Sequence, residues 1–396
     1  MESIKMSSIF KLKKIIGNFV LFILGKIFYL SCKDKPINSL EIKKILATGG
    51  GGGIGDLILA LPAIESLGLN FPHASISLLT SSESAEVLSL FSSRDIISEV
   101  IDYDAKGRHK SLLKKLLLII SLRKRHFDLS YFPSRGEGMR KEALMSFFIG
   151  ASNRLGFSKG NVGLLNTVKV ELKDDVSLLD QNLAILSAAK LRVQRPAKIL
   201  AVPEKDLLEA RNVLKHLIPN CKFPIISIHP GALWHSKSKC WPIEKFSSLI
   251  RYLHEEFNAM IIIVGSKNEL SISRVLSGNI QNPSVVNMIG KTTVVQAAAF
   301  IKQSHLFIGN DSGPFHIANF LNVPTIVLFG ATSPRQIVSS VNNCTIVSKN
   351  LDCSPCYLHH PGLRPDCEDV RCLKEIEVEE VMNAVRKEIK KQAGHD

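Results

Sequence analysis

Aromatic residues are scarce in this sequence. Phe, Trp and Tyr together make up 7% of its 396 residues, and tryptophan occurs twice. We find no RNA-binding aromatic signature, no zinc-finger spacing and no recognition helix, which are the usual sequence marks of nucleic-acid binding. We therefore expect no nucleic acid among the partners of this chain.

Acidic residues are also few relative to basic ones. The sequence has 36 Asp and Glu and 50 Lys and Arg, which gives a formal net charge of +14. A charge of that sign suits an anionic membrane face or a phosphorylated substrate. Apolar residues at 45% and charged residues at 22% exclude a disordered chain. The length allows two domains and a large buried core.

The sequence has no uninterrupted apolar run long enough for a membrane span. The nearest candidate is residues 10–33, which Asn18 and a later lysine interrupt. It lacks a small-residue cleavage site, so we do not expect a signal peptide. Because Lys11, Lys14 and Asn18 fall on one helical stripe, we expect residues 1–40 to include a basic apolar helix lying in a membrane interface. A helix packed on the core and a single membrane-spanning anchor are the alternatives.

The cysteine spacing leaves three alternatives near the end of the chain. Four of the eight cysteines cluster there as Cys353-x2-Cys356 and Cys367-x4-Cys372. Reduced, these pairs could hold zinc. Oxidised, they could form disulfides that cross-link a loop. Because we expect no export signal, disulfides are disfavoured. The third alternative is a loop of buried thiols, and we assign no metal site.

Strand and helix patterns alternate in two separate series along the chain. The first series has strands at 43–49, 74–80, 97–103 and 127–133, with helices at 55–71, 81–91 and 111–125 between them. The second has strands at 223–231, 259–265, 305–311 and 324–330, with helices at 243–257, 294–304 and 313–322. Such alternation is typical of a parallel sheet covered by helices on both faces.

The pattern loosens between residues 170–205, where Pro196 and Pro203 bracket a linker. We therefore expect an α/β chain of two Rossmann-like domains, an N-terminal one over residues 41–195 and a C-terminal one over residues 196–396. Ligands of such domains bind beyond the carboxyl ends of the strands, in the cleft. The polar residues after each strand are thus the candidate site residues.

A glycine-rich turn follows the first strand. Residues 49–53 are all glycine, and Ile54, Gly55 and Asp56 come next. Residues 50–55 formally satisfy G-x-G-x-x-G, which would indicate a nicotinamide-dependent oxidoreductase. Adjacent glycines satisfy almost any such pattern, however, and the ribose-binding acid expected after the second strand is missing. The oxidoreductase remains an alternative that rests on this match alone.

Asp56 decides how this turn is interpreted. It could be a helix-terminal acid, stabilised by the helix dipole. It could instead be a general base that faces the cleft and is kept ionised by the helix N-terminus. Glycines such as Gly53 and Gly55 would then let a bulky acceptor approach the backbone.

A lysine-bearing loop follows the strand that ends at His229. Lys237 and Lys239 lie on this loop, just before Trp241 and Pro242. A lysine in that place, beside a helix N-terminus, could clamp a diphosphate. The alternative is a solvated surface charge.

The third candidate stretch is a turn between a strand and a helix, and it is the most specific of the three. Asp311, Ser312, Gly313 and His316 could all face one ligand from this turn. Pro314 suits an early helical position. Core packing alone would not need Asp, Ser, Gly and His together at a strand end.

Together these stretches resemble glycosyltransferase family 9, the ADP-heptose lipopolysaccharide heptosyltransferases. The residues that match the family's motifs are Gly55, Asp56, Pro62 and Ala63; His229 to Ala232, Lys239, Trp241, Pro242 and Phe246; and Asn310 to Gly313, His316, Ala318, Pro324, Leu328 to Gly330, Thr332 and Pro334. The segment from Cys353 to Cys356 also looks like the family's C-terminal part. The resemblance spans roughly residues 43–385 and leaves the N-terminal segment outside it.

The resemblance implies a GT-B fold, in which two Rossmann-like domains with parallel sheets face a central cleft. It implies metal-independent, inverting transfer of a heptose or related sugar from an ADP-activated donor, which is a co-substrate rather than a cofactor. Asp56 would be the general base, with Gly53 and Gly55 on the acceptor-side loop. The donor-binding residues would be Gly231, Lys239, Glu269, Asp311, Ser312, Gly313 and His316, with Glu269 as a ribose contact.

The acceptor that the resemblance implies is a phosphorylated lipid-linked saccharide, such as the lipopolysaccharide inner core, on the cytoplasmic leaflet. We expect the enzyme in the cytoplasm, peripherally associated with the inner face of the cytoplasmic membrane. A basic helix over residues 106–126 could face the acceptor's phosphates, or its charges could form a solvated face. A non-catalytic sugar-nucleotide-binding protein of the same fold is the remaining alternative.

Overall fold

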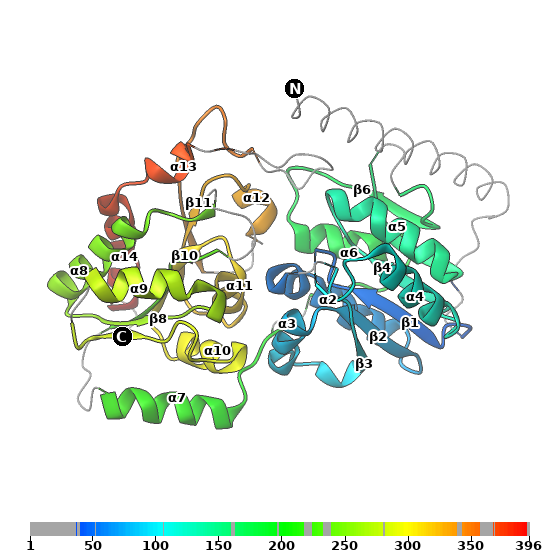
Figure 1. Ribbon diagram of the computed structural model, residues 1–396, viewed down its shortest axis with the longest axis horizontal. Helices are drawn as coiled ribbons and strands as arrows, with labels where there is room; N and C mark the ends of the chain where they lie inside the picture. Colours follow the sequence, from blue (N-terminus) through cyan, green and yellow to red (C-terminus); the bar gives the residue numbers. More distant parts are fainter. Residues whose placement is uncertain are drawn as a thin grey trace.

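The architecture comes from a computed structural model of the chain (Figure 1). It describes residues 37, 40–51, 53–105, 107–159, 163–195, 198–217, 224–232, 239–279, 282–338, 343–356, 367 and 369–393. The expected membrane-interface helix near the N-terminus and the side chain of Lys237 lie outside these residues. Within them the chain forms two six-stranded sheets with helices on both faces, as the sequence predicts.

The first sheet is wholly parallel and has the order β3-β2-β1-β4-β5-β6. Its strands are β1 Lys44–Thr48, β2 Ser75–Thr80, β3 Ile97–Asp102, β4 Leu129–Phe132, β5 Asn153–Ser158 and β6 Val168–Glu171. The accompanying helices are α2 Ile54–Asn70, α3 Ser82–Ala85, η1 Glu86–Leu90, η2 Arg94–Ile96, α4 Leu112–Arg123, α5 Glu137–Ile149 and α6 Leu178–Ala188.

The two faces of this sheet bury different helices, because successive strand residues point to opposite sides. Ile45 and Ala47 of β1 belong to the apolar cluster that also holds the buried residues of α2 and α6. Leu46 between them belongs to the cluster that holds Leu122 of α4 and Met145 of α5. Helices α2 and α6 thus cover one face, and α4 and α5 cover the other.

The second sheet repeats the same arrangement, with the order β12-β11-β10-β7-β8-β9. Its strands are β7 Ile225–His229, β8 Met260–Ile263, β9 Val285–Asn287, β10 Leu306–Asn310, β11 Thr325–Phe329 and β12 Cys344–Ser348. The accompanying helices are α7 Glu204–Leu217, α8 Ile243–Phe257, η4 Lys267–Glu269, α9 Leu270–Asn279, α10 Val294–Lys302, α11 Gly313–Phe320, α12 Pro334–Ile337, α13 Arg371–Lys374 and α14 Val378–Ala393.

Each sheet has one place where the strand order reverses. In the first sheet it lies between β1 and β4, and in the second between β7 and β10. In doubly wound sheets of this kind, ligands bind beyond the carboxyl ends of the strands at that reversal. The fold therefore singles out the residues that follow these four strands.

The two halves meet mainly through helices, as Figure 1 shows. Helix α11 of the second half packs against α2 of the first, and α10 packs against η1. One apolar cluster runs across this contact and includes both Leu57 of α2 and Phe315 of α11. The first turns of α2 and α11 lie against each other, since a Cβ added to Gly313 would be 3.4 Å from Cβ of Ile54.

One sequence-based expectation about the elements was wrong. The single helix expected at 81–91 is instead α3 followed by the 3-10 helix η1. In the segment at 170–205, where the pattern loosens and no element was assigned, the structure has the end of β6 and all of α6, which precede the stretch bracketed by Pro196 and Pro203. The apolar pattern of α6 is interrupted by buried polar residues. One of them is Asn182, which is 1% exposed and donates a hydrogen bond from Nδ2 to Leu59 O at 2.9 Å.

Candidate active site

The candidate site lies where the four strand ends of the two sheet reversals converge. Asp56 stands in the first turn of α2, whose N-cap is Gly53. Its Oδ1 accepts a hydrogen bond from Nη2 of Arg135 at 2.5 Å. The Arg135 side chain is 5% exposed and that of Asp56 is 28% exposed. A buried guanidinium therefore holds a carboxylate that still reaches solvent.

The glycine run brings the backbone against this carboxylate. A Cβ added to Gly51 would overlap Oδ2 of Asp56, so that any side chain at position 51 would displace the acid. The run also contacts the loop after β4, where Ser134 donates a hydrogen bond to Gly50 O. The turn thus encloses the acid of its own helix.

Glu142 of α5 is a second carboxyl group beside Asp56. Its Oε2 accepts a hydrogen bond from Oγ1 of Thr48 at 3.3 Å. Burial, with a smaller contribution from the charge of Asp56, raises the pKa of Glu142 to about 8, although hydrogen bonds from Thr48 and Ser134 and the charge of Arg135 oppose the rise. At neutral pH Glu142 is therefore mostly protonated, and the charge pair of Asp56 and Arg135 is not disturbed by another anion.

Lys239 and Asp311 form the matching charge pair in the second half. Nζ of Lys239 lies 2.8 Å from Oδ2 of Asp311, which also accepts a hydrogen bond from Oγ1 of Thr332 at 2.8 Å. Asp311 is 6% exposed. Burial favours its neutral form, but the charge of Lys239, with contributions from His316 when it is protonated and from the hydrogen bonds of Lys239 and Thr332, brings the pKa of Asp311 down to about 2. Asp311 is thus a fixed negative charge that holds Lys239 in place.

The position of Lys239 is set by the buried tryptophan two residues later. Trp241 is 1% exposed, and its Nε1 donates a hydrogen bond to Ile376 O at 3.0 Å. Its backbone N–H donates to Oδ1 of Asn310 at 3.0 Å, while Nδ2 of Asn310 donates to Pro230 O at 2.9 Å. These contacts tie the end of the lysine loop to the turn after β10.

His229 connects the other predicted donor residues. Its Nδ1 lies 2.9 Å from Oγ of Ser312, and its Nε2 lies 3.1 Å from Oε1 of Glu269. The backbone of Gly231 also lies against Oε1 of Glu269, where a Cβ would overlap it. Burial alone would raise the pKa of Glu269, but His229 and hydrogen bonds from Ser266 lower it to about 2. Both oxygens of Glu269 have protein partners, because Ser266 N donates to Oε2 at 2.7 Å.

His316 lies between the two charge pairs. Its ring is 4% exposed, and Nε2 lies 3.9 Å from Oδ1 of Asp311. Burial lowers its pKa, whereas Asp311 and then Asp56 raise it. Nδ1 of this buried ring has no hydrogen-bond partner among the described residues. A neutral imidazole with one free nitrogen is therefore held at the contact between the two halves.

This arrangement separates two chemical tasks. On the first half, Asp56 is a partly exposed carboxylate that can accept a proton. On the second half, Lys239 and the first turn of α11 offer a cation and backbone N–H groups without intrahelical partners, which together suit an anionic group. The predicted residues Gly53, Gly55, Asp56, Gly231, Lys239, Glu269, Asp311, Ser312, Gly313 and His316 form one continuous set of neighbours around these two tasks.

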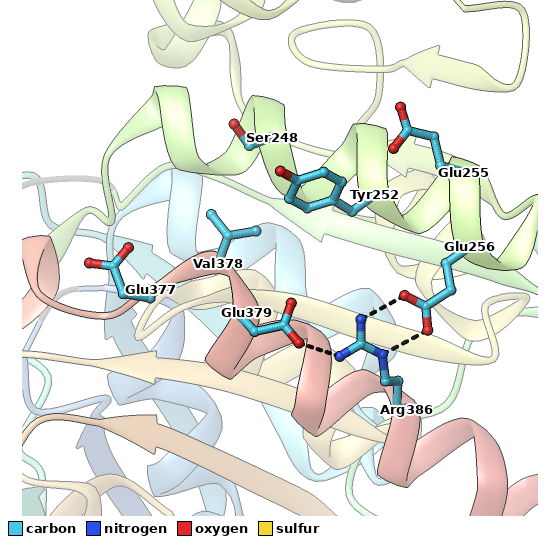
Figure 2. A pocket seen from close by; sticks show the side chains of 8 residues that line it. All are labelled: Ser248, Tyr252, Glu255, Glu256, Glu377, Val378, Glu379 and Arg386. Atoms are coloured by element: carbon cyan, nitrogen blue, oxygen red, sulfur yellow. Dashed lines mark hydrogen bonds and ion pairs between the residues drawn. The ribbon is translucent and has the colours of Figure 1, made fainter.

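A separate surface cavity lies elsewhere, between α8 and α14 (Figure 2). It measures about 630 Å³, and acidic side chains, among them Glu255, Glu256 and Glu377, dominate its lining. The lining cation Arg386 donates to both carboxylate oxygens of Glu256 at 2.7 Å and to Glu379 at 2.5 Å. An acidic lining whose cation is fully paired does not suit a nucleotide diphosphate.

The late cysteines are separate thiols. None of Cys353, Cys356, Cys367 and Cys372 is part of a disulfide. The described residues contain no group of three or more His, Cys, Asp or Glu that could hold a metal ion. Among the described helices, none combines the length and the apolar character that crossing a bilayer requires.

Comparison with known proteins places this site in a family. Residues 117–361 match the model of glycosyltransferase family 9 (heptosyltransferase), which is more than half of the chain. The chain belongs to glycosyltransferase family 9. It is therefore a transferase enzyme, and the resemblance drawn from the three motifs is confirmed.

Curated relatives and a solved structure agree with this assignment. The enzyme is 26% identical over 287 residues to lipopolysaccharide heptosyltransferase 3 of Escherichia coli, covering 70% of this chain and 81% of the relative. It is 27% identical over 340 residues to lipooligosaccharide heptosyltransferase 2 of Campylobacter jejuni, covering 84% and 96%. The structure of E. coli ADP-heptose lps heptosyltransferase II matches with a TM-score of 0.65 at 20% identity, over 88% of this chain and 99% of that one. The fold of the enzyme is GT-B.

Sequence reasoning missed several residues of this glycosyltransferase site. Arg135 and Glu142 follow β4 and belong to none of the motifs that were recognised in the sequence. The strand order of a Rossmann-like domain places β4 beside β1, and the rule that ligands bind at this reversal would have pointed to the residues after β4. His229 and Thr332 were recognised in the sequence only as members of motifs. In the structure His229 is hydrogen-bonded to Ser312, and Thr332 donates a hydrogen bond to Asp311.

Proposed function

We propose that the enzyme transfers a heptose from an ADP-activated donor to a lipid-linked saccharide such as the lipopolysaccharide inner core. The names of the E. coli and Campylobacter relatives and of the solved E. coli structure support this donor and this class of acceptor. The donor binds to residues 196–396, and the acceptor binds to residues 41–195. The transfer inverts the anomeric centre and uses no metal ion.

The observation that carries the proposal is the contact of the two charge pairs through His316. Asp56 with Arg135 lies on one side of this ring, and Asp311 with Lys239 lies on the other. A sugar joined to a diphosphate at Lys239 would reach toward Asp56 across the cleft. The reacting groups would then be held in one orientation, which removes much of the entropic cost of bringing them together.

The proposed reaction is a single displacement. The acceptor hydroxyl gives its proton to the Asp56 carboxylate as its oxygen bonds to the anomeric carbon. The bond from that carbon to the diphosphate oxygen breaks at the same time, and ADP leaves with the electron pair. Lys239 and the N–H groups of α11 stabilise the negative charge that develops on the leaving group.

The glycine turn argues against a dinucleotide at this place. In Rossmann oxidoreductases the pyrophosphate lies against the glycine turn. Here the carboxylate of Asp56 lies against Gly51 and would repel it. The glycines instead allow close packing around an acid, which fits a general base beside an acceptor.

Single-turnover transfer tests this function with the Asp56→Asn variant. The amide keeps the shape and a partner for Arg135 but cannot accept a proton, so the rate at saturating ADP-heptose and acceptor should fall by about 10²–10⁴-fold. Donor affinity should stay unchanged, because the donor binds to the other half. A rate near that of the wild type would show that the base lies elsewhere.

A thermal-shift panel of ADP-, UDP-, GDP- and TDP-sugars tests the donor itself, because a ligand that binds only the folded state raises the melting temperature. ADP-heptose should give the largest shift. A larger shift with NADH than with any of the four sugar nucleotides would contradict the proposal.

A further inference from the structure

Helix α4 exposes an unusual amount of apolar surface. Five of its large hydrophobic side chains are solvent-exposed, namely Leu112 (74%), Leu113 (67%), Leu116 (47%), Leu117 (57%) and Ile120 (51%). No other described element has more than three such residues. Contiguous exposed apolar surface on a folded protein marks an interaction site far more often than isolated exposed residues do.

The five residues share one side of the helix. At 100° per residue they fall within an arc of about 140°, while Leu122 and its neighbours on the opposite arc face the sheet and α5. The sequence led us to expect charges on the outward face of this helix. The structure instead places leucine and isoleucine there, with the charges at the two ends.

The charged residues on α4 and directly beside its two ends are all positive. Lys110 and Lys114 are exposed near the start of α4, and Arg123 and Lys124 are exposed at its end. The helix contains no Asp or Glu. Nη1 of Arg123 donates a hydrogen bond at 2.9 Å to the carbonyl of Phe148 on α5, which lies beside α4 (Figure 1). We call Leu112, Leu113, Leu116, Leu117 and Ile120 with these basic residues the α4 surface.

We propose that the α4 surface docks on the anionic headgroup region of a lipid bilayer, with the apolar side chains entering the boundary between headgroups and acyl chains. An apolar helix face with basic residues at its ends is what an interfacial helix needs, and lysine and arginine near an anionic surface add electrostatic attraction. A second copy of this chain is a poor occupant, because it would bring the same positive ends together on chains that each carry a net charge of +14.

The docking deepens the proposed function and rests on it. Helix α4 follows β3, so that its N-terminus lies at the same edge of the sheet as the turn that carries Asp56. Burial raises the pKa of Tyr103, which lies between β3 and α4, and the charge of the nearby Glu142 also raises it. Docking through α4 would therefore hold the acceptor side of the cleft near the headgroups, where a lipid-linked saccharide is found.

Vesicle sedimentation of the full chain is the first test. The triple variant Leu113→Ser, Leu117→Ser, Ile120→Ser should bind phosphatidylglycerol-containing vesicles at least about tenfold more weakly than the wild type. The matched control changes Leu208→Ser and Leu217→Ser, two α7 residues that are each 46% exposed, and should bind like the wild type. If the triple variant binds vesicles as strongly as the wild type, the proposal is overturned. It is also overturned if the control variant loses as much vesicle binding as the triple variant does.

Tryptophan fluorescence gives a second readout that does not depend on other membrane-binding parts of the chain. A Leu117→Trp variant should be quenched by brominated lipids in anionic vesicles, whereas Leu208→Trp should not. Absence of quenching at position 117 overturns the proposal, and so does a dimer in sedimentation equilibrium that the triple variant abolishes. Protection of the indole at position 117 from an aqueous quencher without vesicles would show that residues 1–36 cover the face, and it would overturn the proposal too.

Transfer assays separate this inference from the proposed function. With an acceptor saccharide freed of its lipid, the triple variant should turn over like the wild type. With the same acceptor in vesicles it should be slower. If the wild type transfers no heptose to either acceptor, the proposed function fails, whatever the vesicle binding shows.

Discussion

The imidazole ring of His316 lies directly against the backbone of Gly55, so that a Cβ at position 55 would be 2.5 Å from Cδ2 and 2.9 Å from Nε2 of the ring. His316 belongs to α11 of the second half and Gly55 to α2 of the first. The contact therefore fixes the spacing between the half that carries Asp56 and the half that carries Lys239. A glycine is needed here because nothing larger fits.

Gly55→Ala should separate the two halves without unfolding either. Alanine favours a helix over glycine by about 0.5–1 kcal/mol, so the melting temperature should not fall greatly. The added methyl group displaces His316, and a misplacement of the order of 1 Å can cost about 10²-fold in rate. Steady-state kinetics and thermal melting of the same sample measure both effects. Gly278→Ala in α9 is the control, since a Cβ there meets nothing within 4 Å; unchanged turnover in Gly55→Ala would contradict the spacing role.

Glu142→Gln should change how stability depends on pH. The folded state holds the proton of Glu142 up to a pKa of about 8, while an unfolded glutamate loses it near pH 4.3. Between these values the folded state binds more protons, so that this group makes stability fall as the pH rises. The glutamine does not titrate, and its melting temperature relative to the wild type should therefore be higher at pH 8 than at pH 5.

The same variant should alter the pH profile of turnover. Ionised Glu142 would compete with Asp56 for Arg135, with Thr48, Ser134 and Tyr103 as its other polar neighbours. Wild-type turnover should thus decline above about pH 8, and Glu142→Gln should lack that decline. Identical pH profiles for the two proteins would show that Glu142 does not influence the base.

Lys239→Ala should weaken donor binding and destabilise the fold through different causes. The lost charge-assisted contact to the diphosphate should cost about 1.5–3 kcal/mol of donor affinity by calorimetry. The buried Asp311 would also lose its main counter-charge. Adding Asp311→Asn removes the buried carboxylate that has lost its counter-charge. The double variant should therefore regain melting temperature but not donor affinity. Donor affinity equal to that of the wild type in Lys239→Ala would make the lysine a purely structural partner of Asp311.

The strands and helices with simple apolar patterns could be predicted from the sequence. Helix α8 has the predicted bounds, and the predicted inward residues Phe246, Leu249, Ile250 and Leu253 are all buried. Two elements were not predicted as they are. Helix α6 was missed because buried amides interrupt its apolar pattern. The helix expected at 81–91 was drawn too long, because α3 is one turn long and continues as a 3-10 helix. Local periodicity carries no information about side chains that are buried because a distant residue binds them.

Some residues of the candidate site could likewise be predicted from the sequence, and others could not. Asp56, Lys239 and Asp311 could be found because they stand in recognisable motifs after strands. Arg135 was missed because it belongs to no recognised motif, and its partner Asp56 follows β1, which is about eighty residues from β4 in sequence but its neighbour in the sheet. The roles of the motif residues as base and donor contacts stay predictions until the transfer and binding measurements are made.

The contact between α2 and α11 has an electrostatic consequence. Both helices meet by their first turns, and each helix end carries about half a positive charge from its backbone dipoles. Like poles therefore face each other, and the two nearby carboxylates do not offset them, because Asp56 is paired with Arg135 and Asp311 with Lys239. An anion entering the cleft acts as the missing counterion between the poles. The diphosphate of a donor would thus strengthen the contact between the two halves, and its departure would weaken it.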